Sequence, residues 1–387
     1  LNNENTNKHQ EFNEELPLLG DATIETSRRD FLKVLGFSVS AAAIAASCEM
    51  PVRKAIPYVF KPEEIVPGIA NYYASSFING SDYCSVLVKT REGRPIKIEG
   101  NTASGLTHGG TSARTQASIM SLYDMHRLRY PKKDGKKTTW KIIDGEIAGK
   151  LSGVSGSIAL VTSSVISPST RAAIAEFRNR YPNTRHVVYE PMSNAGMLYA
   201  NEQQFGTKAI ASYRFDKASI IASFGADFLG TWVSPIEFAS QYAKGRKVSR
   251  ENPVMSKHWQ FEGTMSLTGA NADKRYTILP SQEGAAVVAL YNALSGSGGG
   301  LSDANAQKGI EQLAMELKAN AGKSLVVAGS NDSNVQMVVN AINGMLGNYG
   351  NTLSIERTYN VGQGDDKAMT ALVNDMNAGS VGAVIFY

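Results

Sequence analysis

Short apolar runs alternate with amphipathic segments from about residue 140 to residue 387. Runs typical of buried parallel strands occur in "SIALVTSS", "KASIIASFGAD", "RYTILPS", "KSLVVAGS" and "VGAVIFY". Between them, "STRAAIAEFRNRY" is predicted to be a helix, with Ser167 as its N-cap and Pro168 in its first turn. A second helix, "VQMVVNAINGML", is predicted to end at Gly347. This alternation predicts an α/β fold with open parallel sheets and helices on both faces.

The region before residue 140 has a different pattern. Two apolar runs, 86–88 and 96–98, flank the turn sequence Arg91-Glu92-Gly93-Arg94 and predict a β-hairpin. The polar stretch 101–115 is expected to be a loop, and residues 118–131 to carry a short helix that Pro131 ends. We therefore expect a small strand-rich lobe before the α/β region.

An export signal is predicted near the start. Residues 34–47 carry no charge, and about 14 residues is typical of a signal-peptide apolar region and too short to span a bilayer. "SRRDFLK", which contains Arg28 and Arg29, matches the twin-arginine pattern. The sequence predicts export by the twin-arginine translocase to the periplasmic side of the bacterial inner membrane. The alternative is a basic amphipathic first helix of a soluble domain.

Cys48 follows "AAS" and resembles a lipoprotein cleavage site, where it would become the acylated first residue. Ala45 is a poor match to the larger aliphatic residue usual at that site. We therefore expect a retained signal, with acylation of Cys48 as the alternative.

We expect the chain to be organised in five regions. They are a polar arm (1–26), the signal segment (27–48), an extended linker (49–70), the strand-rich lobe (71–139) and the α/β region (140–387), in which 295–306 is a flexible link. Because Ile385-Phe386-Tyr387 ends inside a predicted strand, we expect the chain to be part of a longer polypeptide.

Composition narrows the classes of function. The net charge is only +4, from 39 basic and 35 acidic residues. We expect no dense Lys/Arg run, no interleaving of aromatic and basic residues, and therefore no nucleic-acid partner. Two cysteines cannot supply the four ligands of an iron–sulfur cluster or a structural zinc site, and the five histidines add no such spacing. No metal site is expected within this chain.

Few residues suggest chemistry by themselves. Gly225 and Asp227 follow a predicted strand and could approach a nucleotide, but we favour the alternative, a strand-to-loop turn with Asp227 as a cap. No spacing ties a histidine to a nucleophile or carboxylate, so we expect surface or hydrogen-bonding roles for His108, His126, His186 and His258.

Several segments carry a resemblance to a known family. In order they are "VKTREGRPIKIEGN", "SARTQASIMSLYDMHRLRYP", "ASIIASFGADFLGTW", "SLTGANADKRYTILPSQEGAAVVALYNAL" and "VVNAINGMLGNYGNTL". Over about residues 70 to 387 the chain resembles molybdopterin oxidoreductases of the polysulfide reductase type. With its twin-arginine signal behind a polar arm, it most resembles the fused molybdopterin-like and iron–sulfur B subunits of alternative complex III.

The departures from that family decide what the resemblance implies. Of the family's four cluster cysteines, Cys84 stands at the third place, Ser112 at the fourth, and the first two have no cysteine. The resemblance therefore implies that the cluster is lost and that Arg114 forms hydrogen bonds or an ion pair instead. In catalytic members of the family, the loop after the second α/β strand supplies the molybdenum ligand. In this chain Ser193 is the sole candidate for that ligand, and the alternative is an ordinary role as a helix cap.

By this resemblance the chain is a non-catalytic scaffold of a membrane quinol:cytochrome c or quinol:oxidase complex. The implied partners are membrane-embedded quinol-binding subunits and multihaem and monohaem cytochrome c subunits, with 4Fe–4S and 3Fe–4S clusters in a C-terminal portion beyond Tyr387. Two alternatives stay open: a catalytic molybdenum oxidoreductase, and a lipid-tethered periplasmic binding protein.

Overall fold

The computed structural model describes residues 63, 65–251 and 253–387. The chain divides into two compact units, 1–63 and 64–387, and the fold below is that of the second unit. The predicted export signal with Arg28 and Arg29, and Cys48, lie outside the described residues.

An antiparallel meander opens the described chain. It consists of β1 (Asn71–Asn79), β2 (Asp82–Arg91) and β3 (Arg94–Gly100). The predicted hairpin is confirmed as β2–β3, with Val88 opposite Ile98. Its turn needs positive φ angles at Glu92 and Gly93, 50° and 75°, and glycine adopts such a conformation without steric cost. The buried face of the meander packs against Ile236 of α6 (Pro235–Arg246).

The helix expected over 118–131 is displaced. Helix α2 (Ala113–Ala117) begins inside the expected loop and continues into the 3-10 helix η1 (Ser118–Leu122). Ser112 caps it by accepting the Thr115 N–H, and beyond η1 the Asp124 side chain accepts the His126 N–H in a turn. His126 is therefore in a loop, and Pro131 does not end the helix.

A small hairpin and a thinly packed helix follow. Strands β4 (Lys132–Lys133) and β5 (Lys136–Lys137) pair antiparallel, and α3 (Trp140–Ser152) comes next. Of the residues in α3, only Leu151 is buried.

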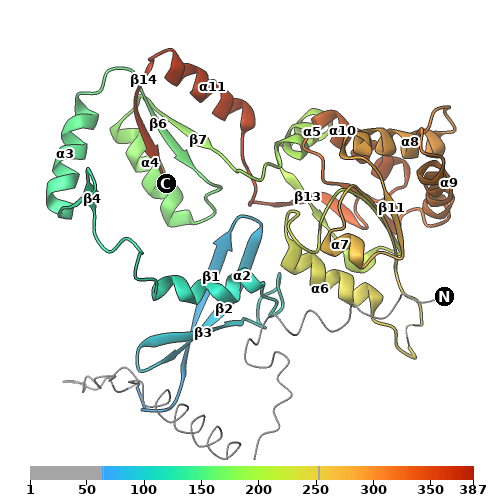
Figure 1. Ribbon diagram of the computed structural model, residues 1–387, viewed down its shortest axis with the longest axis horizontal. Helices are drawn as coiled ribbons and strands as arrows, with labels where there is room; N and C mark the ends of the chain where they lie inside the picture. Colours follow the sequence, from blue (N-terminus) through green and yellow to red (C-terminus); the bar gives the residue numbers. More distant parts are fainter. Residues whose placement is uncertain (1–62, 64, 252) are drawn as a thin grey trace, which may run out of the picture. The chain divides into compact units, whose positions relative to one another are not determined.

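The central sheet is parallel, in the order β11-β10-β9-β12. Its strands are β9 (Ile220–Phe224), β10 (Lys257–Glu262), β11 (Lys274–Thr277) and β12 (Ser324–Ala328). Because side chains alternate along a strand, Ala222 and Phe224 face one hydrophobic core and Ile221 faces another. The first core contains residues of α8 (Glu283–Ser295), α9 (Ala304–Ala319) and α10 (Ser333–Met345), and the second contains residues of α5 (Ala195–Phe205) and α6. Helix α5 also lies beside α10 (Figure 1).

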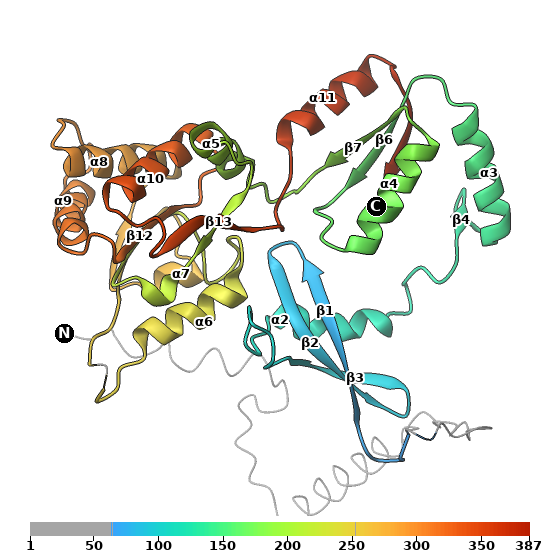
Figure 2. The same ribbon diagram turned by 180° about the vertical axis from the view of Figure 1, so that it is seen from behind.

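A second parallel sheet has the order β14-β6-β7, so the chain forms two parallel sheets with helices. Its strands are β6 (Ser157–Thr162), β7 (Thr184–Val188) and β14 (Val381–Phe386), and its helices are α4 (Pro168–Arg180) and α11 (Asp366–Asn377) (Figure 2). The predicted β-α-β unit is confirmed as β6-α4-β7, with Ser167 capping α4. The C-terminal strand returns to pair with β6, and Leu372 of α11 is fully buried in this sheet's core.

One antiparallel pair was not expected from the pattern. Strand β8 (Ile210–Tyr213) pairs with β13 (Leu353–Tyr359), and the register shifts by a bulge between Ser354 and Thr358. The remaining short elements are η2 (Phe215–Lys217), α7 (Leu267–Ala270) and η3 (Pro280–Gln282). Among the described helices, none has the length and apolar character needed to cross a membrane.

Candidate functional site

Cys84, Ser112 and Arg114 meet in one polar network around Asp82. The Arg114 guanidinium donates from Nε and Nη2 to the two Asp82 carboxylate oxygens at 2.7 and 2.9 Å. The Ser112 hydroxyl donates to Asp82 at 2.7 Å. Thr115 Oγ1 lies 3.1 Å from Cys84 Sγ and 3.0 Å from Ser112 Oγ. Each side chain named in the cluster resemblance is therefore already bonded to another residue of the chain.

The electrostatics of this network are those of a structural ion pair. The Asp82 side chain is fully buried, whereas that of Arg114 is 52% exposed. The hydrogen bond to Asp82 raises the pKa of Arg114. Burial raises the pKa of the Cys84 thiol, which keeps the sulfur protonated and a poor metal ligand. A single buried thiol beside committed hydroxyl groups does not fit an iron–sulfur cluster.

Gly225 and Asp227 lie at the carboxyl end of β9. Gly225 has a φ of 64°, and a Cβ there would lie within 2.7 Å of the Glu283 carboxylate atoms. Asp227 Oδ1 accepts hydrogen bonds from the N–H and hydroxyl of Thr268 at 3.1 and 2.8 Å. The Asp227 carboxylate thus ties its loop to α7 instead of capping its own turn.

Two further carboxylates occupy this edge of the sheet. Burial raises the pKa of Glu283, and the negative charge of Glu262 raises it further. Burial opposes ionisation of Glu262 too, but hydrogen bonds led by those from Arg275 and Ser266 lower its pKa. The Glu283 carboxylate lies against Gly225, where a diphosphate would approach the backbone, and Asp227 is bonded to Thr268, so the residues present do not fit a pterin dinucleotide there.

Ser193 serves the local fold. Its hydroxyl donates to Asp366 Oδ2 at 2.7 Å and accepts the Ala195 N–H at 3.1 Å, which satisfies a donor at the start of α5. Asn331 also donates to the same carboxylate oxygen, at 3.1 Å. Ser193 therefore links the start of α5 to the start of α11.

The histidines are dispersed over different elements. His258 is completely buried, with its ring nitrogens 3.2 Å from Tyr242 Oη and Gln260 Oε1, and burial lowers its pKa to about 4. His186 Nε2 bonds Thr162 at 2.8 Å, and burial lowers its pKa as well. Across the described residues, no three His, Cys, Asp or Glu side chains are grouped to hold a metal ion.

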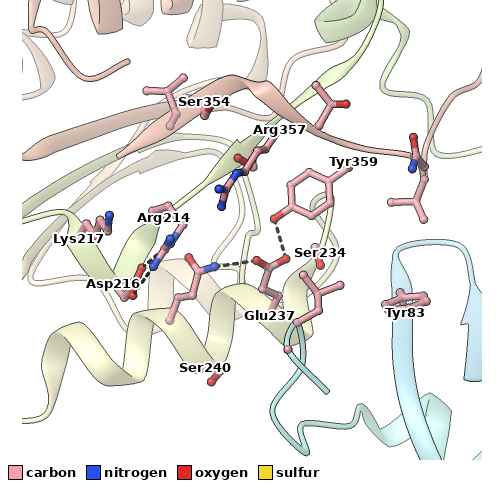
Figure 3. Close-up of a pocket in the computed structure, with 18 of the residues that line it drawn as sticks. Tyr83, Arg214, Asp216, Lys217, Ser234, Glu237, Ser240, Ser354, Arg357 and Tyr359 are labelled. Atoms are coloured by element: carbon pink, nitrogen blue, oxygen red, sulfur yellow. Dashed lines mark hydrogen bonds and ion pairs between the residues drawn. The ribbon is translucent and has the colours of Figure 1, made fainter. Parts of the chain in front are cut away.

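A polar cleft of about 1000 Å³ opens beside the β8–β13 pair (Figure 3). Arg214 donates to both carboxylate oxygens of Asp216 at 3.1 Å, and Lys244 lies 3.6 Å from the same carboxylate. Exposed Arg357 also lines the cleft and lies within the bulged part of β13. Lys217 and His108 also line the cleft.

A buried carboxylate forms the wall of the cleft on α6. Glu237 accepts hydrogen bonds from the Tyr359 hydroxyl at 2.6 Å and from Gln241 at 2.8 Å (Figure 3). Burial raises the pKa of Glu237, although these hydrogen bonds oppose the rise. Burial and the neighbouring Glu237 raise the pKa of Tyr359.

The cleft is suited to binding and lacks an evident reacting group. Asp216 is bonded to Arg214 and Lys244, and Glu237 is bonded to Tyr359 and Gln241. None of these contacts is a nucleophile–base pair. Sequence reasoning missed the cleft because Arg357 belongs to β13 and Arg214 directly follows β8, and this strand pair has no long apolar run. The alternation in "LSIERTY" was the available signal.

Comparisons with known proteins include a distant relative. No family model matches the chain. It is 24% identical over 226 residues to the menaquinone reductase, molybdopterin-binding-like subunit of Nitratidesulfovibrio vulgaris (strain Hildenborough). The match covers 55% of this chain and 31% of that protein, so the chain corresponds to about a third of its relative's length.

Among solved structures, the chain is similar to the formyltransferase/hydrolase complex from Methylorubrum extorquens with methylofuran. The identity is 12%, the TM-score 0.37, and the match covers 65% of this chain and 59% of that one. A likeness this weak leaves the function open. The sequence match relates the chain to a molybdopterin-binding-like subunit of a quinone reductase, and it does not distinguish alternative complex III from other complexes of that kind.

Proposed function

We propose that this chain is a non-catalytic, molybdopterin-oxidoreductase-like scaffold of a membrane quinol-oxidising complex on the periplasmic side of the bacterial inner membrane. Within this class of complexes, the chain would be the B subunit of alternative complex III. Electrons would pass through iron–sulfur clusters in a further C-terminal portion to haem c subunits. The scaffold would hold these parts in position.

The network around Asp82 is the observation that carries this proposal. Arg114 and Ser112 bind the buried Asp82 carboxylate, and Thr115 bonds Cys84. A cluster-binding lobe would need thiolates where these bonded side chains lie. The Asp227 and Glu283 carboxylates at the end of β9 support the same conclusion for a pterin diphosphate.

Metal content and electron transfer test the proposal together. The complex purified from its membrane should contain iron, and molybdenum and tungsten should be far below one atom per copy of this chain. Quinol-to-cytochrome electron transfer should nevertheless be intact. Stoichiometric molybdenum or tungsten would instead support the catalytic alternative.

Ser193→Ala distinguishes a structural serine from a metal ligand. Loss of its bonds to Asp366 and Ala195 should cost about 1–2 kcal/mol of local stability. Electron transfer should stay close to wild type, as in the matched control Ser240→Ala on α6. Loss of both a bound metal and activity in Ser193→Ala alone would contradict the scaffold assignment.

A further inference from the structure

Residues 120–147 expose many large apolar side chains. Met125, Leu128, Met120 and Trp140 are 83%, 76%, 71% and 68% exposed. Others that are more than two fifths exposed in this stretch are Leu122, Tyr123, Tyr130, Ile142 and Ile147. Scattered exposed apolar residues are ordinary, but such a concentration marks an interaction surface. We refer to residues 120–147 as the basic apolar segment.

Positive charge is concentrated in the same place. Between Tyr123 and Lys141 the chain has seven basic and two acidic residues, whereas the whole chain has a net charge of only +4. The expectation of no dense Lys/Arg run and no interleaving of aromatic and basic residues was therefore wrong. The basic residues are Arg127, Arg129, Lys132, Lys133, Lys136, Lys137 and Lys141.

The local structure keeps these cations beside the apolar groups. The β4–β5 hairpin presents four exposed lysines, and the Lys137 ammonium lies 4.3 Å from the centre of the Tyr130 ring. Lys133 binds Glu146 at 2.5 Å, which links the hairpin to α3. Trp140 begins α3 directly after the hairpin. Aromatic, aliphatic and cationic groups thus share one segment.

We propose that the basic apolar segment binds a membrane surface of anionic phospholipids. Lysine and arginine would contact the phosphates, while Trp140, Leu128 and Met125 would enter the boundary between headgroups and acyl chains. The aliphatic groups favour lipid over nucleic acid, because they offer neither hydrogen bonds to bases nor stacking. This inference stands on residues 120–147 and does not depend on the proposed function.

Vesicle flotation of the full chain provides the main test. The wild type should bind phosphatidylcholine vesicles that contain phosphatidylglycerol more tightly than vesicles of phosphatidylcholine alone. Added salt should reduce the difference between the two. Lys136→Gln with Lys137→Gln should weaken the anionic-lipid binding by about tenfold or more. Lys308→Gln with Lys318→Gln, exposed on α9, is the matched control and should bind like the wild type.

The apolar contribution has its own matched pair. Leu128→Ser should weaken binding to the anionic vesicles, whereas Met315→Ser, 66% exposed on α9, should leave it unchanged. The N-terminal segment is identical in all these proteins, so any binding by that segment cancels in the comparison.

Trp140 reports insertion directly. Of the three tryptophans, Trp232 and Trp259 are buried and Trp140 is exposed. Anionic vesicles should shift the fluorescence of the wild type to shorter wavelength, and Trp140→Phe should abolish that shift.

Three results would overturn the inference. They are equal binding to neutral and anionic vesicles, a lysine variant that binds like its α9 control, or no vesicle binding together with lysine-dependent binding of an RNA oligomer.

Discussion

Arg114 neutralises a carboxylate that has no exposed surface. In Arg114→Met, Asp82 would keep the Ser112 hydrogen bond and lose both bonds to the guanidinium. We expect a loss of about 2 kcal/mol in local stability, less than for a fully buried pair because half of the Arg114 side chain faces solvent. Amide hydrogen exchange in β2 and α2 measures this loss.

Arg94→Met is the control for that change, since Arg94 is exposed in the β2–β3 hairpin. Equal protection of β2 and α2 in the two variants would show that the ion pair contributes nothing to holding this lobe together.

His258 should make stability depend on pH. Its pKa is lowered from 6.5 to about 4 because burial disfavours the charged ring. The unfolded chain therefore binds a proton between these values that the folded chain does not, so stability is full above pH 6.5 and falls as the pH drops toward 4. The loss attributable to this group is about 3 kcal/mol.

Unfolding midpoints measured from pH 7 to pH 4 test this dependence. His258→Gln should show a shallower decline than the wild type, whereas His126→Gln, in an exposed loop, should follow the wild type. A decline of the same steepness in all three proteins would assign the pH dependence to other groups.

At the scale of the element, glycines show which helices are closely packed. A Cβ at Gly196 in α5 would lie 2.3 Å from the Asn331 carbonyl oxygen, whereas a Cβ at Gly145 in α3 would meet nothing within 4 Å. Gly196→Ala should therefore lower the melting temperature despite the better helix propensity of alanine. Gly145→Ala should raise stability by about 0.5–1 kcal/mol. Thermal unfolding of both variants checks these opposite signs, and a stabilised Gly196→Ala would refute the close approach.

Elements were predictable where one physical signal was strong. The β2–β3 hairpin and the β6-α4-β7 unit follow from apolar runs, a Gly-containing turn and the Ser167-Pro168 helix start. The position of the helix near residue 118 was predicted wrongly. Ser112 starts the helix earlier by capping α2, and the Asp124 side chain forms a turn before Pro131, the residue predicted to end the helix.

At the scale of the molecule, we predict that the twin-arginine signal directs export of the chain to the periplasmic side. Arg28→Lys with Arg29→Lys should trap it in the cytoplasm, because the paired arginines are the recognition element of the twin-arginine pathway. Cell fractionation measures the outcome, with Arg53→Lys as a control outside the pair. Normal periplasmic assembly of the double variant would refute the export signal.

The α/β class, the main strands and the lack of a four-cysteine cluster motif could be predicted from the sequence alone. Those features depend on local hydrophobic periodicity, on turn residues and on the number of cysteine ligands, which are all properties of the sequence itself. Even so, the basic apolar segment was visible in "HRLRYPKKDGKKTTWK" and was overlooked because the total charge is small. Its charges cancel only over the whole chain, not over its own surface.

The division into two parallel sheets, the cleft beside β13 and the partners of the candidate residues became visible only in the folded chain. Asp82 was not singled out from the sequence, yet its buried carboxylate joins Ser112 to Arg114 across the meander. Ser193 likewise meets Asp366, which is distant in the chain. Hydrogen bonds and ion pairs act over about 3 Å, so only folding brings such groups within range and fixes whether they bind a ligand or one another.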